Sequence, residues 1–280
     1  MGDRAPPADI KLHLRREAGF GCCVCGLPII QYHHIIPWAE EQHFRPEDMM
    51  VLCPTHHDQA TKGAMLEREQ RKHKAKPRNI LLGYAQGLLK VNQPLSAIRI
   101  GSNLLYGEGT LLSVDDEPLL SLFMGDDDNL EISLRLHGED GTLLVEIDRN
   151  EWKTGNALPW DIQADWQKLR IREGARQMAL MLDCTSLPFA IAGRLQQRGA
   201  VFNMTPTRLI IDWVSNPAPG EFVGLAFIAC AINLDTQNRE RTLRPQVPDE
   251  GCWFGNPNDA EKHWTSVWKE RVARRDRAAA

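Results

Sequence analysis

The chain has 280 residues, of which 42% are hydrophobic and 25% are charged, and its formal net charge is −4. This composition is typical of a globular protein large enough for two domains, and it excludes a disordered chain and a uniformly basic nucleic-acid coat. The sequence has neither the ~20-residue apolar run of a membrane span nor a signal segment. Its seven cysteines show no disulfide-like spacing. We therefore expect a protein of the reducing cytoplasm that does not enter a membrane.

The first predicted elements are short and alternate between helix and strand. Apolar residues spaced four apart predict a helix between Asp9 and Gly19. Residues 31–36 and 47–53 are expected to form two strands, and Pro54 suits the first turn of a second helix. The order is therefore helix, strand, loop, strand, helix.

Cysteines and histidines gather around these elements. Two ligand pairs with x₂ spacing predict a closed tetrahedral zinc site, since each pair can hold one ion from a tight turn: Cys22, Cys25, Cys53 and His56. His33, His34 and His57 exceed what such a site needs, and extra histidines are what a second, catalytic metal site would require. A zinc ribbon without catalysis and incidental clustering are the alternatives.

The stretch that contains these pairs resembles the HNH endonuclease family in its zinc-stapled form. Residues 31–38 read QYHHIIPW and residues 47–62 read EDMMVLCPTHHDQATK. They follow the family pattern of C-x-x-C, then [DH]-H-I-x-P, then N-L-x-x-L-C-P-x-[CH]-H-x-x-x-T. The resemblance covers about residues 10–65, and it implies a ββα-metal finger that hydrolyses phosphodiester bonds.

The resemblance also implies a role for individual residues. Four of them correspond to the structural zinc staple: Cys22, Cys25, Cys53 and His56. His34 corresponds to the general base, and His33 and His57 correspond to ligands of the catalytic ion, Mg²⁺ or another divalent cation. Asp48 stands where the family usually has an asparagine that positions the base. Since an ionised aspartate only accepts hydrogen bonds, we expect it to favour a proton on Nδ1 of the base.

A basic run follows the second predicted helix. Residues 62–78 contain seven lysines and arginines against two glutamates. The run can contact phosphates beside the site, although a solvated helix face leading into a linker is an equal alternative. The candidate nucleic-acid contacts are Lys62, Arg71, Lys72, Lys74 and Lys76.

Beyond residue 78 the pattern changes to short apolar or alternating runs separated by glycine-rich turns. The predicted strands are Leu95–Ile100, Thr110–Val114, Leu119–Phe123, Leu130–Leu136, Leu143–Ile147, Leu169–Arg172, Met178–Leu182, Phe189–Ala192 and Leu209–Val214. They predict a mainly-β sandwich, barrel or irregular solenoid. We expect Trp152 and Trp160 to pack in the core of the β domain, and a binding site on the surface is the alternative.

The expected fold is therefore α+β and has three parts. Residues 1–78 would form the HNH nuclease domain with its basic linker, and residues 79–250 a β-rich recognition or sensing domain. Residues 251–280 would form an amphipathic basic helix, because its tryptophans are followed by a basic tail.

Three classes of function remain open on the sequence alone. The leading hypothesis is a metal-dependent HNH endonuclease acting on DNA, and the sequence does not distinguish DNA from RNA. By analogy, a nuclease head on a β module suggests a restriction-like or anti-phage effector. The second is a zinc-stabilised nucleic-acid-binding module without hydrolysis, and the third is an assembly protein whose finger is only a scaffold. Cutting both strands of a duplex would call for a homodimer or a complex with a partner protein.

Overall fold

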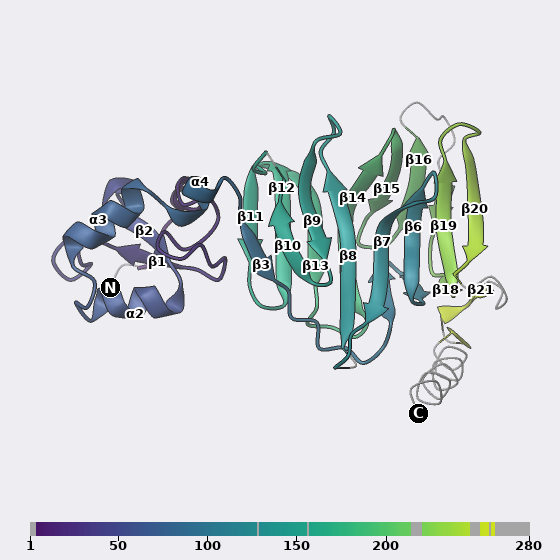
Figure 1. The fold of residues 1–280 in the computed structure, drawn as a ribbon, viewed down its shortest axis with the longest axis horizontal. Coiled ribbons are helices and arrows are strands. Elements are labelled where there is room, and N and C mark those ends of the chain that lie inside the picture. Colours follow the sequence, from purple (N-terminus) through teal and green to yellow (C-terminus); the bar gives the residue numbers. More distant parts are fainter. Residues whose placement is uncertain are drawn as a thin grey trace. The chain divides into compact units, whose positions relative to one another are not determined.

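The computed structural model of the chain is mixed α+β and consists mostly of strands (Figure 1). It forms two compact units, each built from two stretches of sequence: Met1–Lys90 with Thr142–Met181, and Val91–Gly141 with Leu182–Ala280. Among the described residues, every helix is too short or too polar to span a bilayer. The structure describes residues 4–127, 129–155, 157–213, 220–246, 253–257 and 259–260.

The predicted division at residues 78 and 250 stays a prediction, and most of the predicted C-terminal helix lies outside the described residues. The N-terminal part of the first unit, which we call the head, is built from short elements in the predicted order. These are α1 (Ala8–Glu17), β1 (Gln31–His34), the 3₁₀ helix η1 (Pro46–Asp48), β2 (Met49–Leu52), α2 (Pro54–Thr61), α3 (Glu67–Ala75) and α4 (Arg78–Leu82).

The core of the head forms around β2. All four of its residues, Met49–Leu52, are buried, which is why their sequence is continuously apolar and does not alternate. Leu14 and Ala18 of the α1 region join this apolar cluster, as their four-residue spacing predicts. β1 pairs with β2 in antiparallel register, with His33 opposite Met50 and His34 opposite Met49. The histidine doublet is thereby fixed on a short, buried ladder.

The rest of the first unit is made of strands. β10 pairs with β9 on one side and with β3 on the other, both antiparallel, and β11 pairs with β12. Trp152 of β10 is 2% exposed, and a Cβ at Gly87 opposite it would lie 2.8 Å from the indole ring. Trp152 is therefore a core residue. The strands are β3 (Gln86–Leu88), β9 (Leu143–Asp148), β10 (Glu151–Thr154), β11 (Asp161–Ala164), β12 (Lys168–Gly174) and β13 (Gln177–Asp183).

Within this unit, α1 is bound to β11 by a buried ion pair. Arg15 donates from Nε and Nη2 to the two carboxylate oxygens of Asp161, at 2.8 and 2.7 Å, and from Nη1 to the Tyr32 hydroxyl at 2.6 Å. Beside it, the guanidinium of Arg16 lies 4.4 Å from the ring centroid of Trp160. These contacts fix the helix that precedes the metal centre to a strand more than a hundred residues away in sequence.

The second unit also contains two sets of paired strands. One has the order β20-β19-β6-β7-β8, and the other has the order β14-β4-β5-β18-β21, with β15, β16 and β17 paired in succession from β14. β8 lies against β14. The strands are β4 (Ala97–Ile100), β5 (Asn103–Tyr106), β6 (Gly109–Val114), β7 (Glu117–Met124), β8 (Leu130–His137), β14 (Phe189–Gln197), β15 (Ala200–Met204), β16 (Leu209–Trp213), β17 (Gly220–Phe222), β18 (Ala226–Ile228), β19 (Cys230–Asp235), β20 (Glu240–Pro245) and β21 (Trp253–Gly255).

Candidate metal centre and histidine cluster

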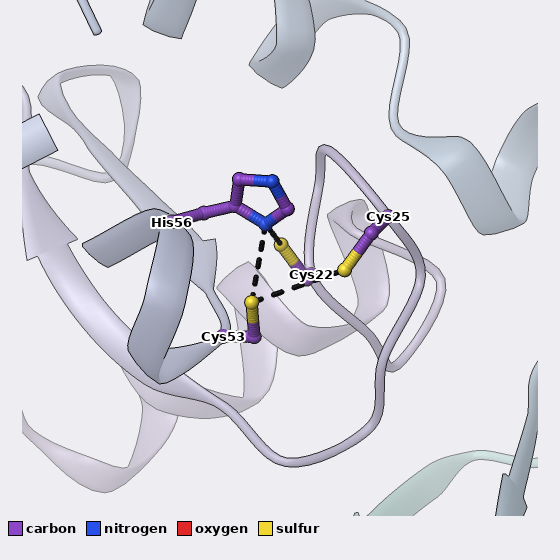
Figure 2. A group of neighbouring side chains, drawn as sticks. All are labelled: Cys22, Cys25, Cys53 and His56. Atoms are coloured by element: carbon purple, nitrogen blue, oxygen red, sulfur yellow. Dashed lines mark hydrogen bonds between the residues drawn. The ribbon is translucent and has the colours of Figure 1, made fainter. Parts of the chain in front are cut away.

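Three cysteines and one histidine converge between the loop after α1 and the start of α2 (Figure 2). Cys22 and Cys25 come from the loop. Cys53 is the residue just before the first turn of α2, and His56 lies in that turn. Their ligand atoms all lie within 4.8 Å of one another. The predicted zinc ligands are therefore brought together by the fold.

The spacing of these atoms fits a tetrahedral ion. Zinc bonds of about 2.3 Å to sulfur and about 2.0 Å to nitrogen place two sulfurs about 3.8 Å apart, and a sulfur about 3.5 Å from a nitrogen. The Sγ atoms of Cys25 and Cys53 are 3.8 Å apart, and Cys22 Sγ is 3.5 Å from His56 Nδ1. The 3.1 Å between Cys53 Sγ and His56 Nδ1 is shorter than this geometry. The four residues can hold a metal ion and are compatible with structural zinc.

The thiols of the cluster would have to lose their protons to bind an ion. Burial raises the pKa of Cys22 to about 12 and also raises the pKa of Cys25. Without a cation these thiols would keep their protons at neutral pH, so an ion bound here must displace them. Because three thiolates and one imidazole fill a tetrahedron, the site has no open position for a substrate, as is usual for a structural metal.

An asparagine that the sequence did not single out fixes the loop of the metal centre. Asn79 of α4 is 3% exposed, and its Nδ2 donates to the carbonyls of Gly19 and Gly26, at 2.9 and 3.1 Å. Gly26 has a φ of +82°, and a Cβ there would lie 2.2 Å from Asn79 Oδ1. The loop that carries Cys22 and Cys25 therefore needs a glycine at position 26 and an amide at position 79.

His33 and His57 form one half of the histidine cluster. Their ring centroids are 5.0 Å apart in an edge-on arrangement. Nε2 of His33 donates to Oε1 of Gln70 at 3.1 Å, because the amide nitrogen of Gln70 is already bound to the Met65 carbonyl. This bond leaves Nδ1 of His33 as the nitrogen with a lone pair, as in histidines that bind metals.

Both imidazoles are neutral at physiological pH. Burial, followed by the nearby His57, lowers the pKa of His33 to about 4, and burial lowers the pKa of His57 as well. Neutral imidazoles are the form that coordinates a cation. The predicted pair of catalytic ligands is thus adjacent and in the right protonation state, although it supplies only two donors.

His34 follows His33 on β1, and its imidazole is held by the main chain. Its Nε2 donates to the carbonyl of His43 at 3.1 Å, so Nδ1 is left as the proton-accepting nitrogen. Burial lowers the pKa of His34 below its ordinary value. The rings of Trp38, His43 and Phe44 surround the imidazole, with centroids at 5.1, 5.4 and 6.1 Å.

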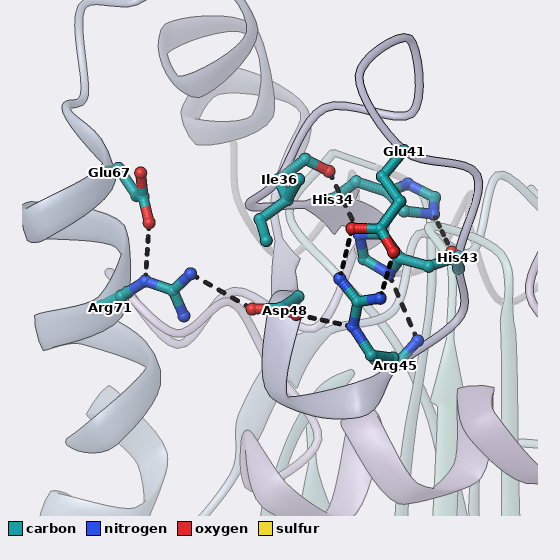
Figure 3. A network of polar contacts seen from close by, with 8 residues as sticks. All are labelled: His34, Ile36, Glu41, His43, Arg45, Asp48, Glu67 and Arg71. Atoms are coloured by element: carbon teal, nitrogen blue, oxygen red, sulfur yellow. Dashed lines mark hydrogen bonds and ion pairs between the residues drawn. The ribbon is translucent and has the colours of Figure 1, made fainter.

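Asp48 is placed differently from the expectation. Its Oδ2 accepts from Nε of Arg45 at 2.9 Å and its Oδ1 from Nη2 of Arg71 at 3.1 Å (Figure 3). Hydrogen bonding to these guanidinium groups, Arg45 first, lowers the pKa of the carboxyl group. The hydrogen bond that orients His34 comes from the main chain of His43, so the predicted direct action of Asp48 on the base is corrected. Asp48 instead braces the loop that carries this carbonyl.

Three of the five predicted nucleic-acid contacts are held in ion pairs. Lys62 pairs with Asp58, and Lys74 pairs with Glu17. Arg71 is shared between Glu67 and Asp48. Lys72 and Lys76 are exposed. Neighbouring carboxylates therefore balance three of the seven basic residues of the run.

A further basic residue, Arg4, could not be singled out from the sequence. It is exposed just ahead of α1, and its positive charge lowers the pKa of His33, His34 and His57 alike. A positive charge that acts on all three histidines would also attract an anion to them. Because Arg4 stands outside the motif and outside the basic run, only the folded chain reveals its place.

Comparisons of the chain with protein-family models, curated proteins and solved structures found no match. Among the described residues, Cys22, Cys25, Cys53 and His56 form the one group of three or more ligand-type side chains that could hold an ion. The metal centre and the histidine cluster are therefore the features of the chain that indicate a function.

Proposed function

We propose that this protein is a metal-dependent endonuclease of the HNH type that hydrolyses DNA phosphodiester bonds, with RNA as a second substrate class. The observation that carries the proposal is the position of His34. It is a buried, neutral imidazole with one nitrogen fixed and the other able to accept a proton, and it follows His33 directly on β1. The Cys₃His site lies between the loop after α1 and α2, the helix that carries His57.

The proton chemistry follows from the hydrogen bonds of His34. Nε2–H is held by the His43 carbonyl, so Nδ1 takes the proton from the water that attacks the scissile phosphorus. The same carbonyl then stabilises the imidazolium that forms. The positive charge of Arg4, which acts on His34, would help to offset the charge of the phosphate.

The His33–His57 pair fits a divalent cation only in part. Imidazole donors suit Ni²⁺ or Zn²⁺, whereas Mg²⁺ and Mn²⁺ prefer oxygen ligands and would take most of their ligands from water and the substrate. When bound, such a cation would offset the negative charge that develops on the phosphate. Gln70 keeps the lone pair of His33 Nδ1 available for this purpose.

A plasmid-nicking assay tests the proposal. Zinc-loaded protein is incubated with supercoiled DNA and with Mn²⁺, Ni²⁺ or Mg²⁺ in turn. Removing a general base lowers the rate by about 10²- to 10⁴-fold, so the His34→Ala variant should lose nicking and keep its zinc. His13→Ala is the matched control, because His13 is exposed on α1. Equal nicking by His34→Ala would remove this residue as the base.

The alternative is a zinc-stabilised nucleic-acid-binding module without hydrolysis. It is favoured by the small number of donors at the second site, where His33 and His57 belong to no group of three or more ligand-type side chains among the described residues. DNA mobility shifts without cleavage under every divalent cation would support this alternative. In either case we infer that the strand-rich remainder recognises a target, a signal or a partner protein, as in a restriction-like or anti-phage effector.

A further inference from the structure

Two aromatic side chains form an aromatic wall beside His34, which we define as Trp38 and Phe44. Both belong to the loop between β1 and η1, and their ring centroids are 5.0 Å apart. The Trp38 centroid lies 5.1 Å from that of His34, and the Phe44 centroid lies 6.1 Å from it. The wall is thus in direct contact with the proposed base.

The wall is partly open, while the groups behind it are closed off. His34 and His43 are buried, whereas Trp38 and Phe44 are only half-buried. Within the described part of the chain, the apolar core of the head takes in Phe44 at its margin but does not include Trp38. Packing of the core therefore accounts for Phe44 better than for a large indole ring that keeps part of its surface in water.

The loop holds the wall in a fixed position. His43 donates from Nε2 to the Ile36 carbonyl at 3.3 Å and accepts at Nδ1 from the Arg45 main-chain N–H at 3.3 Å. Arg45 is in turn bound to Asp48 and to Glu41 (Figure 3). A rigid aromatic surface loses little conformational entropy when it binds a flat ligand.

We propose that the aromatic wall stacks a nucleobase of the substrate next to the scissile phosphate, so that the site acts on unpaired or splayed nucleotides. A base inside a duplex presents its edges in the grooves and its faces to its neighbours, so it can stack on protein only after it leaves the helix. Aromatic side chains bind any base through its π face, which gives affinity without sequence preference. The positive charge of Arg4, which acts on the same histidines, complements the phosphate attached to that base.

This inference rests on the proposed function, because it places the base beside the reactive phosphate. It adds what the motif residues do not specify, namely the class of substrate. We expect the protein to bind and cut single-stranded or frayed nucleic acid in preference to intact duplex.

The test compares two substitutions at Trp38, one to an aliphatic side chain and one to an aromatic side chain. Trp38→Leu and Trp38→Phe both keep an apolar side chain, but only phenylalanine can stack. Each is made in the zinc-loaded His34→Ala background, so that binding is measured without cleavage. The probe is a single-stranded oligonucleotide that carries 2-aminopurine, whose fluorescence falls when it stacks. Trp166→Ala is the control, since Trp166 is 50% exposed on the strand-rich part of the first unit.

Binding to the oligonucleotide should quench the probe, and Trp38→Leu should weaken binding about tenfold and abolish the quenching. Trp38→Phe and Trp166→Ala should retain both. Equal affinity and quenching in Trp38→Leu would overturn the inference, as would tighter binding of intact duplex than of single strands. Neither outcome of this binding assay bears on whether the wild-type protein nicks plasmid DNA. Failure of the proposed function would show itself separately, as wild-type protein that cuts neither single-stranded nor duplex substrates.

Discussion

The buried pair of Arg15 and Asp161 offers a quantitative test of how the head is held to the strands of its unit. The two side chains are 9% and 3% exposed and are joined by two hydrogen bonds, at 2.8 and 2.7 Å. Removing one member of a buried pair leaves an uncompensated charge and costs about 3–5 kcal/mol. Tyr32 and Gln163 also hydrogen-bond to the pair, but neither carries a charge that could replace the lost partner.

We expect Arg15→Met and Asp161→Leu each to destabilise the first unit by about 3 kcal/mol. The double substitution should cost clearly less than the sum, because it removes both buried charges and leaves an apolar contact. The assay is urea unfolding of zinc-loaded protein, together with hydrogen exchange at the amides of α1 and β11, since a protein with two units need not unfold in one step. Single-variant losses below about 1 kcal/mol, or strict additivity, would refute the reasoning.

Three further predictions concern the metal centre and the loop beside it. The Cys53→Ser variant should lose most of its zinc, and its head should unfold at a lower temperature, because metal binding and folding are coupled. Metal analysis and a melting curve test this, and a wild-type zinc content and melting temperature would contradict it. Asn79→Ala should lower stability by about 1–3 kcal/mol, since the carbonyls of Gly19 and Gly26 lose their partner; an unchanged urea midpoint would argue against that role. Asp48→Asn should loosen the loop and slow nicking, whereas faster nicking would instead indicate that the carboxylate acts on the base itself.

The local elements of the head could be predicted because their signals are local. The x₂ spacing of the cysteine and histidine pairs, the proline at the start of α2 and the continuously apolar β2 each depend on a few adjacent residues. In the rest of the chain, predicted strand bounds were also close to the observed ones. The predicted strand Leu130–Leu136, for example, is observed as Leu130–His137. The alternation of buried and exposed residues in that strand is strict enough to reveal it.

Pairing over long distances could not be predicted in this way. Ile232 of β19 lies opposite Leu112 of β6 in a parallel pair, and no turn between them sets the register. The same limit applies to the site, where Gln70, Asn79 and Arg4 act on the histidines or on the metal loop from elements outside the motif. Asp48 shows a different limit: its position in the motif suggested a contact with His34, but two arginines nearby compete for the carboxylate.

The metal centre and the histidine cluster are structurally coupled, because both use residues at the start of α2. His56 and His57 are consecutive, and successive side chains on a helix point about 100° apart, so one ring can face the cysteines while the next faces His33. The main-chain N–H of His57 donates to the carbonyl of Cys53 at 2.8 Å, which fixes the phase of this turn. An ion held by Cys53 and His56 would therefore set the direction of His57. Zinc removal should separate the His33–His57 pair even where the β1–β2 ladder survives, so loss of nicking should precede loss of strand structure during chelation.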